Sequence, residues 1–198
     1  MIPRICIDID NVIAQTDEVM RDVIREYTDG HVTLGYDHVQ TFEYHECKDA
    51  DGHRITQLDW KVIHNLFAER SRILSVKPYP FVQARLRELS DSFAIHLATS
   101  RLPKARQTTV EWLDRNCFDF KYDLHFVQHR EKHASLGQFT AAVEDDYEQA
   151  KAFASDVGTP CLLMRHPWNE KRPQVNGVEH VDDWTELTEK LLRSLPSA

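Results

Sequence analysis

Short apolar segments alternate with amphipathic ones along much of the chain. Between the later apolar segments, apolar positions recur at helical spacing over residues 103–116 and 147–157. The apolar segments are short and mostly bounded by polar or turn residues, which is typical of buried strands. They cover Arg4 to Ile9, Phe93 to Ala98, Leu124 to Val127, Phe139 to Val143 and Pro160 to Met164. This alternation predicts an α/β fold: a Rossmann-like parallel sheet with helices on both faces and ligands at the carboxyl ends of the strands.

Residues 16–75 depart from this alternation because they contain two helical patterns and no run of buried strands. Thr16 is placed to cap the first helix, which we expect to stop at Gly30. The second helix is predicted from Leu58 to Arg70, with Leu58, Val62, Ile63, Leu66 and Phe67 as its apolar stripe. We therefore expect a small helical cap, residues 16–75, inserted after the first strand of a core made of residues 1–15 and 76–198.

Two more amphipathic helices are expected in the core. The first runs from Phe81 to Leu89, after Pro78 and Pro80, and the second closes the chain from Asp182 to Leu195. No internal repeat or low-complexity tract interrupts this organisation.

Composition narrows the classes of protein to consider. Apolar residues make up 41% of the chain and charged residues 28%, and no run is long enough to span a membrane. The N-terminus enters an apolar strand at once and does not look like a secretory signal, so we expect a cytoplasmic protein without a membrane partner. The four cysteines Cys6, Cys47, Cys117 and Cys161 are widely separated and predict reduced thiols, not a zinc site or disulfides.

The formal net charge of -8 disfavours binding to a nucleic-acid polymer, which needs a basic surface. It does not exclude a small phosphorylated substrate, because a metal ion and a few local cations can reverse the field inside a cleft. A homodimer is compatible with the sequence.

Two carboxylates, Asp8 and Asp10, stand at the end of the first predicted strand. Burying them is costly unless they are paired or bound to a cation. The alternative is a turn or a helix cap.

Three further polar groups follow later strands. Thr99 and Ser100 come after the second strand and offer hydroxyls and backbone N–H groups to a phosphate, or else cap the next helix. Lys132 follows the third strand and is either a site cation or a solvated lysine. Glu144, Asp145 and Asp146 end the fourth, where adjacent acids repel unless a divalent cation neutralises them. Arg101 has two options, a phosphate contact or an ion pair with a surface acid.

The ordered series ICIDIDNV, HLATSR, Lys132 in HREK and AAVEDD resembles the haloacid dehalogenase-like hydrolase superfamily. The resemblance implies a phosphomonoesterase in which Asp8 forms an aspartyl-phosphate and Asp10 moves the proton. That role requires Asp10 to be protonated in the substrate complex, and hence to have a raised pKa there. The resemblance also implies Mg²⁺ held by Asp8, the Asp10 carbonyl and Asp145, with Glu144 and Asp146 orienting metal-bound water or serving as alternative ligands. Thr99, Ser100 and Lys132 would bind the phosphate.

The helical insertion, the Thr-Ser-Arg at Thr99 and the segments near Arg165 and Asp182 resemble the 5'(3')-deoxyribonucleotidase-like group, the type C 5'-nucleotidases. Asn11 stands where members of that group often carry Gly or Thr. This resemblance implies a nucleoside or deoxynucleoside 5'-monophosphate as substrate. Phe42, Tyr44 and Trp60 either stack on a nucleobase or pack between the cap helices. The other hypotheses are a phosphatase of a small non-nucleotide phosphometabolite and a catalytically silent metal- or phosphate-binding regulator.

Overall fold

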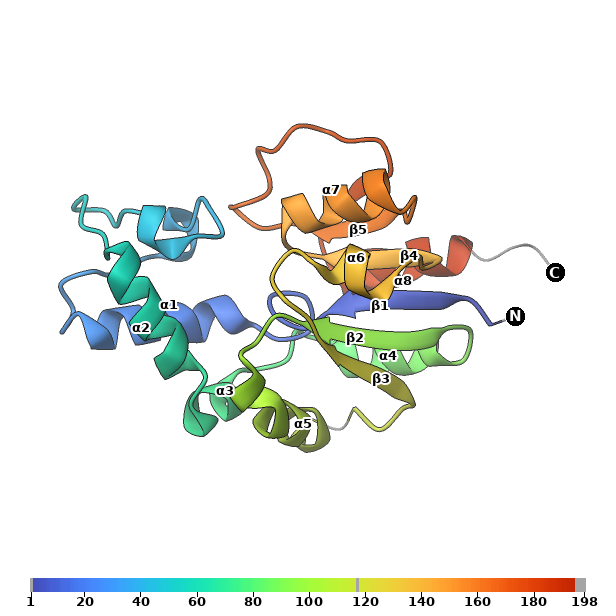
Figure 1. The fold of residues 1–198 in the computed structure, drawn as a ribbon, viewed down its shortest axis with the longest axis horizontal. Helices are drawn as coiled ribbons and strands as arrows, with labels where there is room; N and C mark the ends of the chain where they lie inside the picture. Colours follow the sequence, from blue (N-terminus) through green and yellow to red (C-terminus); the bar gives the residue numbers. More distant parts are fainter. Residues whose placement is uncertain (1, 117, 195–198) are drawn as a thin grey trace.

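The expected parallel sheet forms the centre of the protein (Figure 1), a computed structural model that describes residues 2–116 and 118–194. Within these residues the sheet has six strands in the order β3-β2-β1-β4-β5-β6, and all neighbours pair in parallel. The strands are β1 (Arg4–Asp8), β2 (Ala94–Thr99), β3 (Tyr122–Phe126), β4 (Ala141–Glu144), β5 (Cys161–Met164) and β6 (Val178–Val181). The predicted fold class is confirmed.

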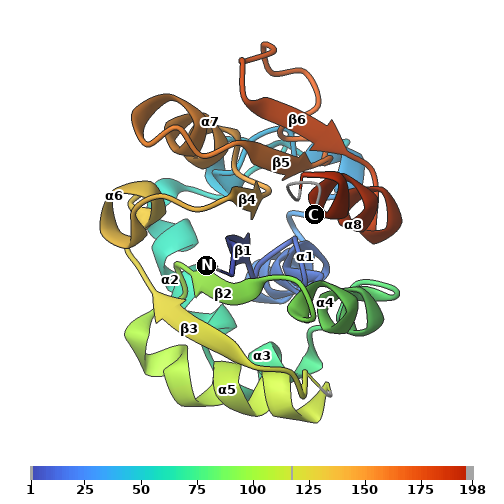
Figure 2. The ribbon, with the colours of Figure 1, turned by 90° about the vertical axis from the view of Figure 1, so that its right-hand side faces the viewer.

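Helices cover both faces of the sheet (Figure 2). Ile5, Ile7, Ile95 and Leu97 belong to the large core on one face, together with Trp112 and Leu187 from helices, while Cys6, Ala98 and Phe153 belong to the smaller core on the other. The covering elements are α4 (Val82–Ser90), η3 (Pro103–Ala105), α5 (Arg106–Arg115) and α8 (Trp184–Arg193) on the first face, with α6 (Lys132–Leu136) and α7 (Tyr147–Asp156) on the second.

The position of β1 in the sheet determines where the acidic residues meet. β1 lies between β2 and β4, and Asp8 is in register with Ala98 near the end of β2. Thr99 and Glu144 are the last residues of those two neighbouring strands. Parallel pairing therefore gathers the polar groups that follow three strands at one edge of the sheet.

The segment between β1 and α4 is helical and lies beyond the carboxyl ends of the strands (Figure 1). Its helices are α1 (Thr16–Tyr27), η1 (Tyr36–His38), η2 (Tyr44–Glu46), α2 (Gln57–Phe67) and α3 (Arg70–Ser75). Contacts join α1 to α2 and α3 to α5, so the segment packs on itself and on the core. That residues 16–75 act as a separate cap remains our proposal.

Three expectations within this segment were wrong. The second helix is broken, because α2 ends at Phe67 and α3 begins at Arg70. Ile63 and Phe67 are buried as expected, but Leu58 and Val62 are exposed, since the core meets only one side of α2. Thr16 is the first residue of α1 and does not cap it, because its hydroxyl donates to Asp10 Oδ1 at 2.6 Å.

The later part of the chain follows the prediction with smaller differences. β6 was not expected because Val-Glu-His-Val is not an apolar run. Val110 of α5 is exposed, whereas its neighbours Trp112 and Leu113 are fully buried. Cys117 and Leu195 lie outside the described residues, within which Cys6, Cys47 and Cys161 are buried free thiols. In the described part of the chain, every helix is too short or too polar to span a bilayer.

Candidate active site

Asp8 is a buried carboxylate held from one side by Lys132. Lys132 Nζ lies 2.8 Å from Asp8 Oδ1. The backbone N–H of Ile9 donates to the same oxygen at 2.7 Å. Lys132 is itself buried and also donates to both carboxylate oxygens of Glu144 at 3.0 Å. One ammonium group thus pairs with two carboxylates. Lys132 and the N–H of Ile9 both contact Oδ1 of Asp8, which leaves Oδ2 unbonded within the described residues.

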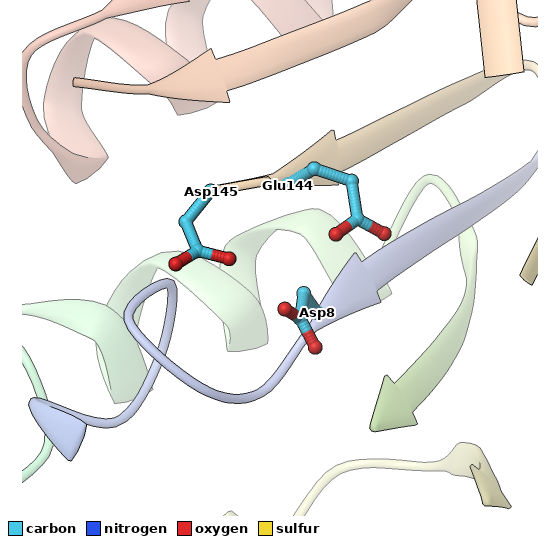
Figure 3. Close-up of side chains that lie close together, drawn as sticks. All are labelled: Asp8, Glu144 and Asp145. Atoms are coloured by element: carbon cyan, nitrogen blue, oxygen red, sulfur yellow. The ribbon is translucent and has the colours of Figure 1, made fainter. Parts of the chain in front are cut away.

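Asp145 completes a cluster with Asp8 and Glu144, and the three carboxylates point toward one another (Figure 3). A ligand oxygen from each lies within 4.8 Å of the others. Asp145 Oδ2 accepts a hydrogen bond from Asn11 Nδ2 at 3.1 Å, and no ion pair reaches Asp145 from the residues the structure describes. Asp146 is occupied elsewhere, because it accepts from Arg130 Nε at 2.8 Å and from the N–H of Glu148 at the start of α7. Of the two candidate ligands, Asp145 is the one placed beside Asp8.

Asp10 forms an ion pair with Arg101. Arg101 donates to Asp10 Oδ1 through Nη2 at 2.8 Å and through Nε at 3.0 Å. Burial would raise the pKa of Asp10, but the Arg101 charge and hydrogen bonds from Arg101, Thr16 and Thr99 hold that pKa below its usual value. The raised pKa was expected in the substrate complex and stays a prediction; in the structure without substrate, Arg101 favours the carboxylate form of Asp10. Of the two options for Arg101, the structure shows an ion pair, and the acid is a site residue.

Thr99 also differs from its expected place. It is fully buried, and its hydroxyl donates to Asp10 Oδ2 at 3.0 Å. It is absent from the lining of the cavity described below, whereas Ser100 is part of it. In this structure Thr99 orients Asp10, and of the two residues Ser100 is the one that lines the cavity.

The charges at the site do not balance. The site has five carboxylates, on Asp8, Asp10, Glu144, Asp145 and Asp146. Three cations, Arg101, Arg130 and Lys132, pair with all of them except Asp145, so two negative charges are left when all five carboxylates are ionised. Burial and the neighbouring carboxylates raise the pKa of Asp145 well above its usual value, and burial raises that of Asp8. The residues therefore fit a divalent cation, because an all-oxygen carboxylate set with two unbalanced charges matches Mg²⁺.

A cavity of about 510 Å³ lies between these carboxylates and the helical insertion. From the core it is lined by Asp8, Asp10, Asp145, Lys132 and Arg130. From the helical insertion it is lined by Phe42, Tyr44 and Trp60, which we call the aromatic wall. The Tyr44 and Trp60 rings stack with centroids 5.0 Å apart, and Phe42 stacks on His129 at 5.1 Å. These aromatics therefore pack on neighbouring rings and face the cavity as well.

Sequence reasoning missed the roles of Asn11 and Arg130. Asn11 has a positive φ of 57°, a signal that a lone Asn after a strand gives only weakly. Arg130 also has a positive φ, of 60°, and joins Asp146 to the cavity. Neither contact follows from spacing along the chain, because each depends on how the loops after β1 and β3 approach β4.

Several solved structures share this fold over nearly the whole chain. A haloacid dehalogenase-like family hydrolase from Streptococcus pneumoniae aligns with a TM-score of 0.66 and 13% identity, over 96% of this chain and 98% of the other. A protein described as a predicted phosphatase from Clostridium acetobutylicum aligns with a TM-score of 0.66 and 15% identity, over 98% and 100%. CbbY from Rhodobacter sphaeroides, in complex with phosphate, aligns with a TM-score of 0.60 and 16% identity, over 94% of this chain and 96% of the other.

No protein-family model and no curated protein sequence matches this chain. At these identities the structural matches establish the fold alone. The chain therefore has the haloacid dehalogenase-like fold, as the four motifs implied. None of the three descriptions names a nucleotidase, so the resemblance to that narrower group remains a prediction.

The unbalanced charge predicts opposite effects of two neighbouring substitutions. In EDTA, Asp145→Asn should raise the melting temperature by a few degrees, since about 1 kcal/mol corresponds to about 2–4 °C at this size. It removes a buried carboxylate that no cation balances. Asp146→Asn, the matched control, should lower the melting temperature because Arg130 loses its partner.

The same two variants should differ in their response to metal. Millimolar Mg²⁺ should stabilise the wild type and Asp146→Asn but not Asp145→Asn, as measured by thermal unfolding. Equal stabilisation of Asp145→Asn by Mg²⁺ would contradict the assignment of the cation to Asp8 and Asp145.

Proposed function

We propose that the protein is a divalent-cation-dependent phosphomonoesterase with Asp8 as its nucleophile. The observation that supports this most directly is the buried cluster of Asp8, Glu144 and Asp145, served by one lysine and left with two unbalanced charges in the lining of a cavity. The fold adds support, because this chain shares it with a haloacid dehalogenase-like hydrolase and with a protein described as a predicted phosphatase. Mere metal or phosphate binding is disfavoured because both Asp8 and Asp10 are present.

The residues suit a two-step transfer. Asp8 Oδ2 attacks phosphorus as the ester oxygen leaves, and water then breaks the aspartyl-phosphate and releases inorganic phosphate. Lys132 holds phosphoryl oxygens, and its charge opposes the rise in the pKa of Asp8 that burial causes. Asp10, held as a carboxylate by Arg101, is suited to accept the proton of the attacking water. Its protonation of the leaving alkoxide requires that the contacts with Arg101 loosen once substrate is bound.

Mg²⁺ would be held by the carboxylates of Asp8 and Asp145, with the backbone carbonyl of Asp10 as the further protein ligand expected from the motif. When bound, it supplies positive charge that neutralises the phosphoryl oxygens and allows one anion to attack another. Glu144 is engaged by Lys132 through both its oxygens, so its part is to hold Lys132 in place.

The nucleophile assignment is tested by Asp8→Asn. With Mg²⁺ and an aryl phosphate, the variant should lose at least about 10³-fold in kcat, because an amide does not form the covalent intermediate. EDTA should abolish the wild-type activity. The released phosphate is measured directly, and circular dichroism checks that the variant is folded. Wild-type turnover by Asp8→Asn would rule out the mechanism.

For the substrate we propose a nucleoside or deoxynucleoside 5'-monophosphate. The cavity is large enough for a base and a sugar, and the aromatic wall offers ring surfaces in the same cavity as the carboxylates. A small phosphometabolite is the second candidate. It is favoured by the fold match to CbbY from Rhodobacter sphaeroides, which has also been described with xylulose-1,5-bisphosphate.

Trp60→Ala separates these two substrate classes. If a base stacks on the wall, the variant should raise KM for nucleotides by about 10-fold or more, as the loss of about 1–3 kcal/mol of stacking implies. KM for glycolate or sugar phosphates should change little. Leu58→Ala on the same helix is the control, because Leu58 is 72% exposed and does not line the cavity. A wild-type preference for small phosphometabolites, unaffected by Trp60→Ala, would overturn the nucleotide proposal.

A further inference from the structure

Asn11 makes more contacts across the site than any role considered so far requires. It lies in the loop between β1 and α1, is buried, and has a left-handed backbone with φ of 57°. Its Nδ2 donates to Asp145 Oδ2 at 3.1 Å, and its Oδ1 accepts from the backbone N–H of Asp17 at 2.8 Å. One carboxamide thus bridges a carboxylate at the end of β4 and the first turn of α1.

The chemistry of this bridge is specific to an amide. A carboxamide donates through nitrogen and accepts through oxygen, so it satisfies a carboxylate and an N–H group at the same time. An aspartate at this position would place another negative charge beside Asp145, and a glycine would leave both partners without a side-chain bond. Because the amide is neutral, it orients Asp145 without removing the unbalanced charge of the cluster.

The bridge continues into the wall of the cavity. α1 has no capping side chain at Gln15, so Asn11 Oδ1 supplies the acceptor for its first turn. The Asp17 carboxylate in turn accepts from the Tyr44 hydroxyl at 2.7 Å, and Tyr44 stacks on Trp60. Consecutive contacts therefore run from Asp145 through Asn11 and α1 to the aromatic wall.

The backbone of Asn11 is fixed as well. Its carbonyl accepts a hydrogen bond from His166 Nε2 at 2.8 Å, and the other ring nitrogen of His166 lies 2.9 Å from the Tyr36 hydroxyl. Since a carbonyl only accepts, His166 carries its proton on Nε2 and accepts from Tyr36. The loop after β1 is therefore held between β4, α1 and the loop after β5, which limits the positions open to the carboxamide.

We infer that Asn11 is a positioning residue that couples cation binding at Asp145 to the order of α1 and hence to the aromatic wall. This inference rests on the cation site of the proposed function. Binding of a cation to Asp145 would fix its carboxylate, which fixes the carboxamide and the first turn of α1. The expected consequence is that the metal orders one wall of the substrate cavity that it does not touch.

Asn11→Gly tests the inference with little risk to folding, because glycine adopts a positive φ without strain. The dissociation constant for Mn²⁺, measured by electron paramagnetic resonance of free Mn²⁺, should rise by about 10- to 100-fold, the usual effect of losing a partner of a metal ligand. Asp29→Gly is the matched control. Asp29 also has a positive φ, of 50°, but lies exposed beyond the end of α1, so its replacement should leave Mn²⁺ affinity unchanged.

Hydrogen exchange tests the coupling itself. Mn²⁺ should slow exchange in peptides covering the first turn of α1 in the wild type and in Asp29→Gly. In Asn11→Gly this protection should be absent even at saturating Mn²⁺. In Tyr44→Phe, which breaks only the later contact with Asp17, protection of α1 should persist while protection around Tyr44 and Trp60 is reduced.

The outcomes separate this inference from the proposed function. An Asn11→Gly variant that binds Mn²⁺ within twofold of the wild type, or keeps the protection of α1, overturns the coupling while leaving the phosphatase proposal intact. A wild type that binds no Mn²⁺ overturns both.

Discussion

The structure depends on the cost of burying Asp8, Glu144 and Asp145 around the single ammonium group of Lys132. In a low-dielectric site, carboxylates without a balancing positive charge destabilise the fold, and most of the other contacts of the site supply such a charge. Arg101 balances Asp10, Arg130 balances Asp146, and Lys132 is shared by Asp8 and Glu144. Among the described residues, the Asp145 carboxylate accepts a hydrogen bond only from the neutral amide of Asn11. The negative charge that remains at Asp8, Glu144 and Asp145 is suited to a bound cation.

The fold explains why this cost arises at one place. β1 lies between β2 and β4, so residues that are far apart in the sequence end at the same edge of the sheet. The helical insertion lies beyond that edge and leaves a cavity between its aromatic side chains and the carboxylates. The same insertion begins with α1, whose first turn is bonded to Asn11. Consecutive contacts therefore connect the carboxylate cluster to the aromatic wall.

Much of this arrangement could be predicted from local pattern. Apolar runs identified β1 to β5, and the acids and hydroxyls that follow them indicated the edge where they gather. Pattern does not decide which partner a side chain chooses. Arg101 could have met a phosphate or a surface acid, and in the structure it forms an ion pair with Asp10, which holds the pKa of Asp10 below its usual value. The contacts of Asn11 could not be predicted either, because they require a left-handed backbone and two partners from separate elements.

Errors in the helices have a related cause. Leu58 and Val62 complete an apolar stripe on α2, but the core reaches only the side that carries Ile63 and Phe67. β6 was overlooked because an edge strand with exposed Glu179 lacks the continuous apolar run of a central strand. The sequence records which residues are apolar, while the extent of the surface that covers them is a property of the tertiary fold.

The most direct measurement for the central claim is a crystal structure with Mn²⁺ in place of Mg²⁺, using anomalous scattering to locate the ion. The account predicts one strong peak within bonding distance of a carboxylate oxygen of Asp8 and one of Asp145, with Lys132 still paired to Glu144. A fully active enzyme that shows no peak between Asp8 and Asp145 at saturating Mn²⁺ would contradict it.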